Sequence, residues 1–401
     1  MNYTEDYERI EQIVKELEPE LKKLALKIHD HPEGGHQEFK ACQWQTELLK
    51  KYGFSVMDHF CNMPTAYKAV YQGTKQGPRI AMLAEYDALK KIGHGCGHNL
   101  IAMVGTGSGI AMREFADKYG GEIVVIGTPA EETDGAKVAM AEQGAFDDCD
   151  VVMMAHPSYE FTDSLATSAV MGVTVEFFGK AAHAANSPEQ GENALDAMIS
   201  FYNLISMARQ RMKDHTRIHG IITNGGVESN TIPDYTAAEF LIRAPRMSGI
   251  PELYDIVCEC ARGAAAATRT RENVKKMPGT YMDTHSNQVL NKIACGHMEE
   301  LGAKIRYSGG AVHQGSSDVG NVSYRCPVIQ LKFKIGDPPE GASPASGHSL
   351  DFAEKAASDT AINNGLMYVK GFVRTAIDLM TQPELCKEIR EEFLREIPGR
   401  G

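Results

Sequence analysis

The sequence predicts an α/β protein with a doubly wound, mainly parallel sheet and a smaller α+β domain inserted into it. Three short apolar runs, at residues 79–84, 122–127 and 150–155, are the main basis for this prediction. Each run lacks alternation of polar and apolar residues, which is typical of strands buried on both faces. Helix-like segments at 100–119 and 136–144 separate the runs, and this order favours a parallel sheet.

Each of the three runs passes into acidic residues or a histidine. Asp87 follows the first run, Glu131 and Glu132 follow the second, and His156 follows the third. In a doubly wound sheet the carboxyl ends of the strands meet at one edge, where ligands bind. We therefore expect these side chains to line one cleft.

The larger domain is expected to comprise residues 1–167 and 282–401. Apolar residues recur at helical spacing near the start of the chain, between Ile10 and Ile28, and predict an amphipathic helix. Residues 326–335 resemble a late strand, and residues 351–380 a long closing helix.

The inserted domain, residues 168–281, is expected to fold as a compact βαββαβ unit. An open sheet edge and a helix pair make such a domain a natural surface for a homodimer. Its predicted elements lie at 169–178, 193–213, 216–224, 235–243, 250–268 and 273–277.

Composition restricts the partners and the location. The chain has 401 residues, of which 43% are hydrophobic, so it can form two cores. A net charge of −12 and a pI near 5.6 argue against nucleic acid or an anionic membrane as partner. We see no basic and apolar leader and no apolar run near the ~20 residues of a membrane span. Nine cysteines without a regular framework suit a reducing cytoplasm.

The segment His94-Gly95-Cys96-Gly97-His98 is the most specific chemical signal in the chain. Its glycines permit a tight loop in which Cys96 and His98 point to one place. Thiolate and imidazole are preferred ligands of divalent transition metals. Two ions that share the thiolate could hold a hydroxide, because they lower the pKa of bound water from about 15.7 towards 7. The plausible ligand set is Cys96, His98, Glu132 and His156, with His348 as a candidate fifth member.

The adjacent Glu131 and Glu132 project in different directions if they end a strand. One can then bind metal while the other takes a proton from water and passes it to the leaving nitrogen. A solvated acidic turn is the plainer interpretation of an isolated pair of glutamates, but the neighbouring motifs favour the catalytic one.

These motifs resemble those of the M20 family of metallopeptidases and amidohydrolases, and within it the aminoacylase-1-like-2 branch. That branch includes aminobenzoyl-glutamate hydrolases and dipeptidases, and the resemblance covers nearly the whole chain. It rests on His348 and on the segments 84–89 (AEYDAL), 92–100 (IGHGCGHNL), 128–132 (TPAEE), 154–157 (MAHP), 179–183 (GKAAH), 225–234 (GGVESNTIPD) and 315–323 (GSSDVGNVS).

The resemblance implies a two-metal amidohydrolase in which Cys96 is the bridging thiolate. Zinc or manganese is expected, and cobalt or nickel would also suit these ligands. Glu131 would be the general base and acid, and Asp87 would accept a hydrogen bond that orients a ligand. The other metal ligands would be His98, Glu132, His156 and His348.

The resemblance also implies a role for the inserted domain. His183 and Asn230 would reach the active site of a partner subunit, where they stabilise the oxyanion or bind the substrate. Arg243, near the end of an alternating strand, is a candidate clamp for a substrate carboxylate, although a structural arginine is an equal alternative.

Two departures from the branch bear on the substrate. Lys90 and Lys91 stand where the branch usually has Pro-Gly, and they could favour an acidic substrate, although a solvated pair is the plainer interpretation. Asp134 replaces a small residue and could contact a positive group of the substrate.

Three functions remain open. The favoured one is metal-dependent hydrolysis of an amide bond in a small N-acyl amino acid or dipeptide-like substrate. The second is a hydrolase that uses Cys96 as nucleophile and needs no metal. The third is a catalytically silent homologue that binds small molecules, which is disfavoured because every position for ligation and base catalysis is filled.

Overall fold

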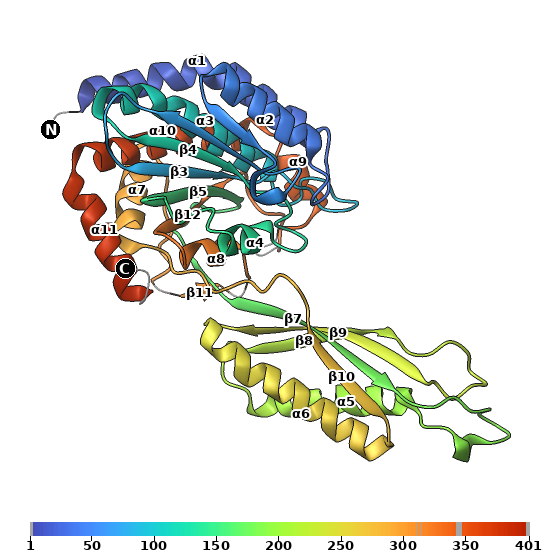
Figure 1. Ribbon diagram of the computed structural model, residues 1–401. Helices are drawn as coiled ribbons and strands as arrows, with labels where there is room; N and C mark the ends of the chain where they lie inside the picture. Colours follow the sequence, from blue (N-terminus) through green and yellow to red (C-terminus); the bar gives the residue numbers. More distant parts are fainter. Residues whose placement is uncertain (1–2, 310, 314, 342–346, 398–401) are drawn as a thin grey trace. The chain divides into compact units, whose positions relative to one another are not determined.

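The computed structural model describes residues 3–309, 311–313, 315–341 and 347–397, which form two compact units (Figure 1). The larger unit lies within Met1–Ala166, Thr284–Ala311 and Asn321–Gly401. The smaller unit comprises Thr167–Asp283 and Val312–Gly320. The sequence pattern places residues 312–320 in the larger domain, whereas in the structure this segment belongs to the smaller unit.

In the described part of the larger unit, six strands form one sheet in the order β1-β2-β4-β3-β5-β12. The neighbours β4, β3, β5 and β12 run parallel, and β2 and β1 add an antiparallel edge. The doubly wound, mainly parallel sheet predicted from the sequence is therefore confirmed. The strands are Ser55–Asp58 (β1), Tyr67–Gln72 (β2), Arg79–Ala84 (β3), Glu122–Gly127 (β4), Val151–Ser158 (β5) and Val328–Lys334 (β12).

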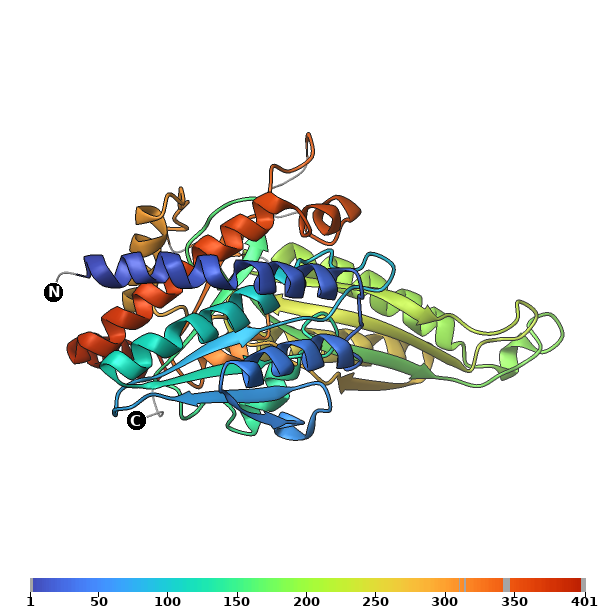
Figure 2. The same ribbon diagram turned by 90° about the horizontal axis from the view of Figure 1, so that it is seen from above.

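Three helices cover one face of this sheet. α3 packs on β3, β4 and β5, and both α1 and α10 pack on α3. Figure 2 shows these three helices together above the strands. The helices of the larger unit are Thr4–His29 (α1), Phe39–Lys51 (α2), His98–Tyr119 (α3), Ala136–Glu142 (α4), Gln288–Glu300 (α7), Leu350–Lys355 (α9), Asp359–Thr381 (α10) and Pro383–Glu396 (α11).

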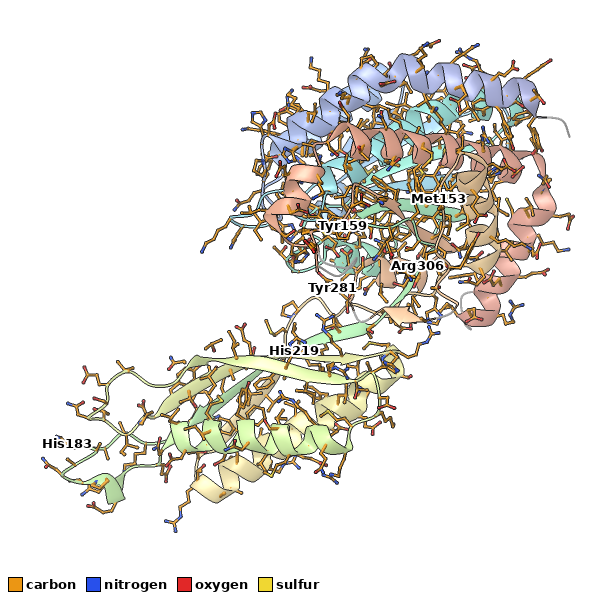
Figure 3. The ribbon with its side chains drawn as sticks, turned by 180° about the vertical axis from the view of Figure 1, so that it is seen from behind. Met153, Tyr159, His183, His219, Tyr281 and Arg306 are labelled. Atoms are coloured by element: carbon orange, nitrogen blue, oxygen red, sulfur yellow. The ribbon has the colours of Figure 1, made fainter. Side chains whose placement is uncertain are left out.

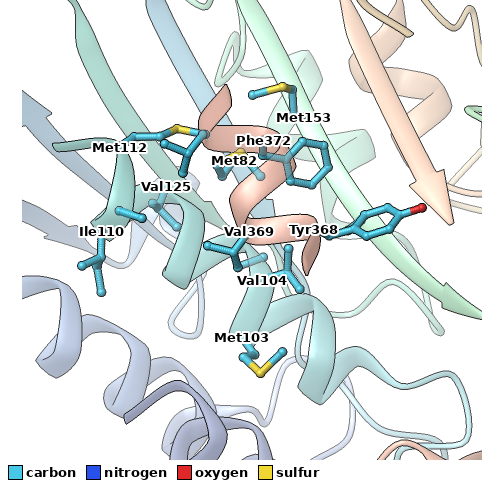
Figure 4. Packing of buried hydrophobic residues seen from close by; sticks show 14 of the residues in the cluster. Met82, Met103, Val104, Ile110, Met112, Val125, Met153, Tyr368, Val369 and Phe372 are labelled. Atoms are coloured by element: carbon cyan, nitrogen blue, oxygen red, sulfur yellow. The ribbon is translucent and has the colours of Figure 1, made fainter. Parts of the chain in front are cut away.

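The main core lies between the sheet and α3. Every residue of α3 from His98 to Met112 is buried, because the helix is enclosed by strands on one side and by helices on the other. Met82 of β3, Val104 of α3 and Phe372 of α10 belong to this core (Figure 4).

The closing helix predicted at 351–380 is wrong in one respect, because the structure has two helices there, α9 and α10. The hydroxyl oxygen of Ser358 accepts a hydrogen bond from the backbone N–H of Ala361 and caps the start of α10. A capping serine of this kind begins a new helix instead of continuing the old one. α2, α7, α11, β1 and β2 have no counterpart among the predicted elements.

The smaller unit has, in its described residues, a four-stranded antiparallel sheet in the order β10-β7-β9-β8. The helices α5 and α6 pack on this sheet and on each other around one core, which includes Phe201 and Phe240. The predicted βαββαβ order is confirmed. The elements are Ala169–Phe178 (β7), Ala194–Ala208 (α5), Arg217–Asn224 (β8), Tyr235–Ala244 (β9), Ile250–Thr268 (α6) and Arg271–Lys276 (β10).

The remaining elements are short. They are the strands Ala166–Thr167 (β6) and Val312–His313 (β11), the helix Val319–Ser323 (α8), and the 3₁₀ turns Phe60–Asn62, Pro188–Gln190, Arg209–Arg211 and Met247–Gly249.

No helix in the described part of the chain combines the length and the apolar character needed to cross a lipid bilayer.

The contact between α3 and β3 depends on a glycine, and this yields a prediction. A Cβ atom on Gly105 would lie 2.5 Å from the backbone oxygen of Leu83, which cannot rotate away. We expect Gly105→Ala to lower the free energy of unfolding by about 1–3 kcal/mol in urea denaturation. A Cβ atom on Gly296 in α7 would have nothing within 4 Å, so Gly296→Ala should instead raise it by about 0.5–1 kcal/mol. Equal stabilities of the two variants would contradict this packing.

Candidate metal centre

The chemically reactive side chains of the larger unit gather where β3, β4 and β5 end. Asp87 follows β3, Glu131 and Glu132 follow β4, and His156 lies near the end of β5. Their convergence follows from parallel strands that present their carboxyl ends at one edge.

The loop before α3 brings Cys96 and His98 to the same edge. Gly97 between them has φ 73°, in the left-handed region that glycine tolerates. A Cβ atom on Gly97 would lie 2.8 Å from Cγ of Pro157, so the loop packs closely on the residue after His156. His348 joins the same place, because its backbone N–H donates to the carbonyl of Gly95.

Three groups of possible ligand atoms lie here, and within each group all the atoms are within 4.8 Å of one another. Cys96 is a member of two of these groups, and no other residue links those two. The groups, among the described residues, are Cys96, His98 and His156; Cys96, Glu132 and His348; and His98, Glu131 and Glu132. All five metal ligands predicted from the sequence, together with Glu131, are thus brought together.

Asp87 connects two of these side chains. Nδ1 of His98 donates to Oδ1 of Asp87 at 2.9 Å, and the backbone N–H of Glu132 donates to Oδ2 at 2.9 Å. Burial alone would raise the pKa of Asp87, but the charge and hydrogen bond of His98 lower it to about 2. In the neutral form of His98, a proton held on Nδ1 leaves the lone pair on Nε2, which is the form that ligates metals.

Two buried polar atoms provide a test of whether a metal ion fits. Nε2 of His98 and Oε1 of Glu132 lie 3.8 Å apart, and neither has a hydrogen-bond partner among the described residues. Nε2 of His348 is 3.1 Å from the same glutamate oxygen but outside hydrogen-bond geometry. A buried polar atom without a partner costs about 1–3 kcal/mol. A divalent ion bonded to both atoms would remove that cost, so these residues fit a metal ion.

His156 and Cys96 are also held in forms that can bind metal. Nδ1 of His156 donates to the carbonyl of Pro157 at 2.8 Å, and its Nε2 is 3.7 Å from Sγ of Cys96. Burial would raise the pKa of the Cys96 thiol, yet interactions with His156 and hydrogen bonds from His348 and His98 lower it to about 5. The sulfur is therefore held as the thiolate, which is the metal-binding form.

Two buried carboxylates near the site carry no signal in the sequence. Glu85 and Lys137 are both fully buried and form an ion pair at 2.6 Å, and Oε2 of Glu85 is 3.7 Å from Nε2 of His98. Glu38 accepts the backbone N–H of Ala130 at 2.8 Å and the hydroxyl of Thr65 at 2.9 Å. Ala130 has φ 57°, so Glu38 supports an unfavourable backbone conformation directly before Glu131.

The predicted residues of the inserted domain lie in the smaller unit. Nδ1 of His183 accepts the backbone N–H groups of Ala185 and Asn186 at 3.2 Å each, and the N–H of Ala184 donates to the carbonyl of Asn230. His183 and Asn230 therefore lie on adjacent loops. Figure 3 shows His183 at one end of this unit, away from His219.

Arg243 lies beside His219 and so away from His183. Its Nη1 donates to the hydroxyl oxygen of Ser316 at 2.8 Å, and its Nε is 3.3 Å from Nε2 of His219. Among the described residues Arg243 forms no ion pair with a carboxylate.

Two cavities of the larger unit lie near the Cys96 loop. One, of about 360 Å³, is lined by Cys96, His156, Pro157, Ser158, Lys332, Gly347, His348 and Phe352. The other, of about 550 Å³, contains Lys90 and Lys91 together with His29 and His94, and its lining includes none of the candidate ligands.

The double role of Asp87 leads to a prediction about metal affinity. Asp87→Asn removes the charge that orients His98, and we expect about 10- to 100-fold weaker metal binding, measured by competition with a chelator. Asp134→Asn is the matched control, because Asp134 lies on the neighbouring loop and pairs with His36 at 2.7 Å instead of with a ligand. The assignment of Asp87 would be wrong if the two variants retained metal equally well.

Comparison with known proteins identifies relatives of the chain. Residues 165–253 match the model of the peptidase dimerisation domain of the M20 family. The chain is 37% identical to mouse Xaa-Arg dipeptidase over 96% of its length and 91% of that protein's. It is 28% identical to one of the subunits of p-aminobenzoyl-glutamate hydrolase from Escherichia coli, over 92% and 91% of the two chains.

A solved structure shares the fold of most of the chain. The YXEP protein of Bacillus subtilis, described as a dinuclear metal binding peptidase of the M20 family, superimposes with a TM-score of 0.66. The match covers 91% of this chain and 99% of the other at 16% identity. The sequence relatives show that this protein is a hydrolase of amide bonds, and the chain belongs to the M20 family of peptidases.

Proposed function

We propose that this protein hydrolyses the amide bond of a small N-acyl amino acid or dipeptide-like substrate at a pair of divalent metal ions. The membership of Cys96 in two separate groups of ligand atoms is the observation that carries the proposal. A thiolate has lone pairs for two ions, so one sulfur can serve both groups. We assign the ions to Cys96, His98, Glu132, His156 and His348.

The ligand types are compatible with several divalent metals. One thiolate, three imidazoles and a carboxylate suit zinc or manganese, and cobalt or nickel would also bind. When bound, two such ions lower the pKa of a shared water and polarise the carbonyl of the amide.

The side chains of the protein supply the proton transfers and the orientation. Glu131 takes the proton of the attacking water and returns it to the leaving nitrogen. Asp87 and the carbonyl of Pro157 accept the Nδ1 protons of His98 and His156, so that both imidazoles keep Nε2 for metal.

A small substrate suits the cavity beside Cys96. Its volume of about 360 Å³ is at the lower end of the range for small-molecule sites, which begins near 300 Å³. The relatives named for a dipeptide and for p-aminobenzoyl-glutamate support the same class of substrate.

The smaller unit would contribute to substrate binding in a homodimer. We assign His183 and Asn230 to the oxyanion or the substrate in the partner's active site, and Arg243 to a substrate carboxylate. The match to a dimerisation domain supports a dimer. So does β8, an edge strand on which Ile221 is 65% exposed, because such an edge favours pairing with another chain.

We also propose a cytoplasmic location. All nine cysteines are free in the structure, and proteins without disulfides are typical of a reducing compartment.

Removal of the metal tests the proposed function directly. We expect about two ions per chain, and loss of hydrolysis after chelation with recovery when metal is restored. The assay is a panel of dipeptides, N-acyl amino acids and aminobenzoyl-glutamate. Metal-free protein that still cleaves would favour Cys96 as nucleophile, and this activity would be lost on thiol alkylation.

Replacement of Glu131 tests the assigned base. Glu131→Gln should leave the metal content unchanged and lower kcat by at least about 10²-fold, because general acid–base catalysis contributes 10²- to 10⁴-fold. Glu142→Gln, at an exposed position in α4, is the control and should leave kcat unchanged. Retention of most activity by Glu131→Gln would exclude Glu131 as the base.

A further inference from the structure

We propose that Lys332 binds a carboxylate of the substrate and so selects acidic amides for this site. The inference rests on the proposed function, since it concerns the cavity in which that reaction would occur. Lys332 lies outside every motif that identifies the family in the sequence, and neither the sequence pattern nor the comparisons assign it a role.

The strand register places Lys332 beside a candidate metal ligand. Lys332 of β12 is the direct partner of His156 on the parallel strand β5. Paired residues on neighbouring strands point to the same face of a sheet, with about 5 Å between them. Because Nε2 of His156 is 3.7 Å from Sγ of Cys96, the side chain of Lys332 begins next to the candidate metal centre.

The cavity lining agrees with the register. Lys332 lines the cavity of about 360 Å³ together with Cys96, His156 and His348. Lys332 therefore borders the space that a substrate would enter.

The charge of Lys332 has no anionic partner in the described residues. No ion pair or hydrogen bond joins its Nζ to any residue that the structure describes. The remaining positions cannot supply one from a side chain, because residues 1–2, 310, 314, 342–346 and 398–401 contain neither Asp nor Glu. A half-buried ammonium without an anion is unfavourable, and a bound carboxylate would relieve it.

The charged groups near Lys332 are already engaged. Arg306, whose charge acts on Lys332, pairs with Glu160 at 2.8 Å. Burial and the charge of Arg306 hold the pKa of Lys332 below its ordinary value, and the Cys96 thiolate offsets part of this shift. The Cys96 thiolate is the anion whose charge acts on Lys332, and in the proposed function it serves the metal ions. The substrate is then the remaining source of a negative charge.

Lys334 provides an internal comparison on the same strand. It also points to the face of Lys332, because residues two apart on a strand share a face. Its Nζ is 2.5 Å from Asp337, and it does not line the cavity. One lysine of β12 is thus neutralised within the protein, and the other faces the cavity with its charge available.

The test compares dipeptides that differ by one carboxylate. Ala-Glu and Ala-Gln differ at the C-terminal side chain, Glu-Ala and Gln-Ala at the N-terminal side chain, and Ala-Gln and its C-terminal amide at the α-carboxylate. The pairs distinguish the possible sources of the carboxylate. Lys332→Met keeps the length of the side chain and removes the charge, and Lys334→Met is the matched control.

We expect Lys332→Met to lower kcat/KM about 10- to 100-fold for the acid of one pair, and to leave its carboxamide partner nearly unchanged. That pair identifies the carboxylate that Lys332 binds. Lys334→Met should change neither member. Equal losses for acid and carboxamide in all three pairs would overturn the proposal, and so would loss of metal from Lys332→Met.

A binding measurement separates this proposal from the proposed function. Glutarate should bind the metal-loaded wild-type protein at least about 10-fold more tightly than Lys332→Met in titration calorimetry. If the wild-type protein hydrolyses no amide, the proposed function fails, while this binding difference still tests Lys332. Equal affinities of the two proteins for glutarate would overturn the role of Lys332.

Discussion

The candidate site depends on the carboxylate of Asp87, which holds two elements of the fold at once. One oxygen accepts the imidazole N–H of His98, at the start of α3, and the other accepts the backbone N–H of Glu132, after β4. A single rigid group thereby sets the distance between two candidate ligands from different parts of the chain. Because Asp87 is itself buried at the end of β3, the central sheet determines where both of them lie.

Other buried charged residues also support the geometry around the site. Glu38 holds the strained backbone of Ala130, and the pair formed by Glu85 and Lys137 lies close to His98. Burial of a charge is unfavourable unless it is paired and hydrogen-bonded. The free-energy cost of burying these charges is consistent with a site in which geometry is maintained at the expense of stability. This is usual where catalysis needs fixed groups.

Much of the fold follows from local patterns in the sequence. The strands β3 and β4 coincide with apolar runs, and the βαββαβ order of the smaller unit follows from its alternating periods. The break between α9 and α10 is not evident, because apolar residues continue across Ser358 and only the capping bond reveals it. α2 and α11 are also not evident from the sequence, since polar residues dominate their composition.

Some residues of the candidate site can likewise be recognised from the sequence, and others cannot. Residues of metal-binding type such as Cys96 and His98 can be found in the sequence, because their close spacing is supported by the polar residues that follow the other apolar runs. Lys137, Glu38 and Lys332 cannot, because a charged residue in a local pattern suggests solvent and only the tertiary structure shows its burial. The roles assigned to His183, Asn230 and Arg243 stay predictions, since they depend on a second subunit.

The candidate ligands come from segments that are widely separated along the chain, from Cys96 near the start of α3 to His348 just before α9. An ion bound to them would close long loops, much as a disulfide does in an extracellular protein. All nine cysteines of this chain are free, so bound metal ions, and not disulfides, would connect these distant segments. The free energy of unfolding would then increase with the concentration of free metal.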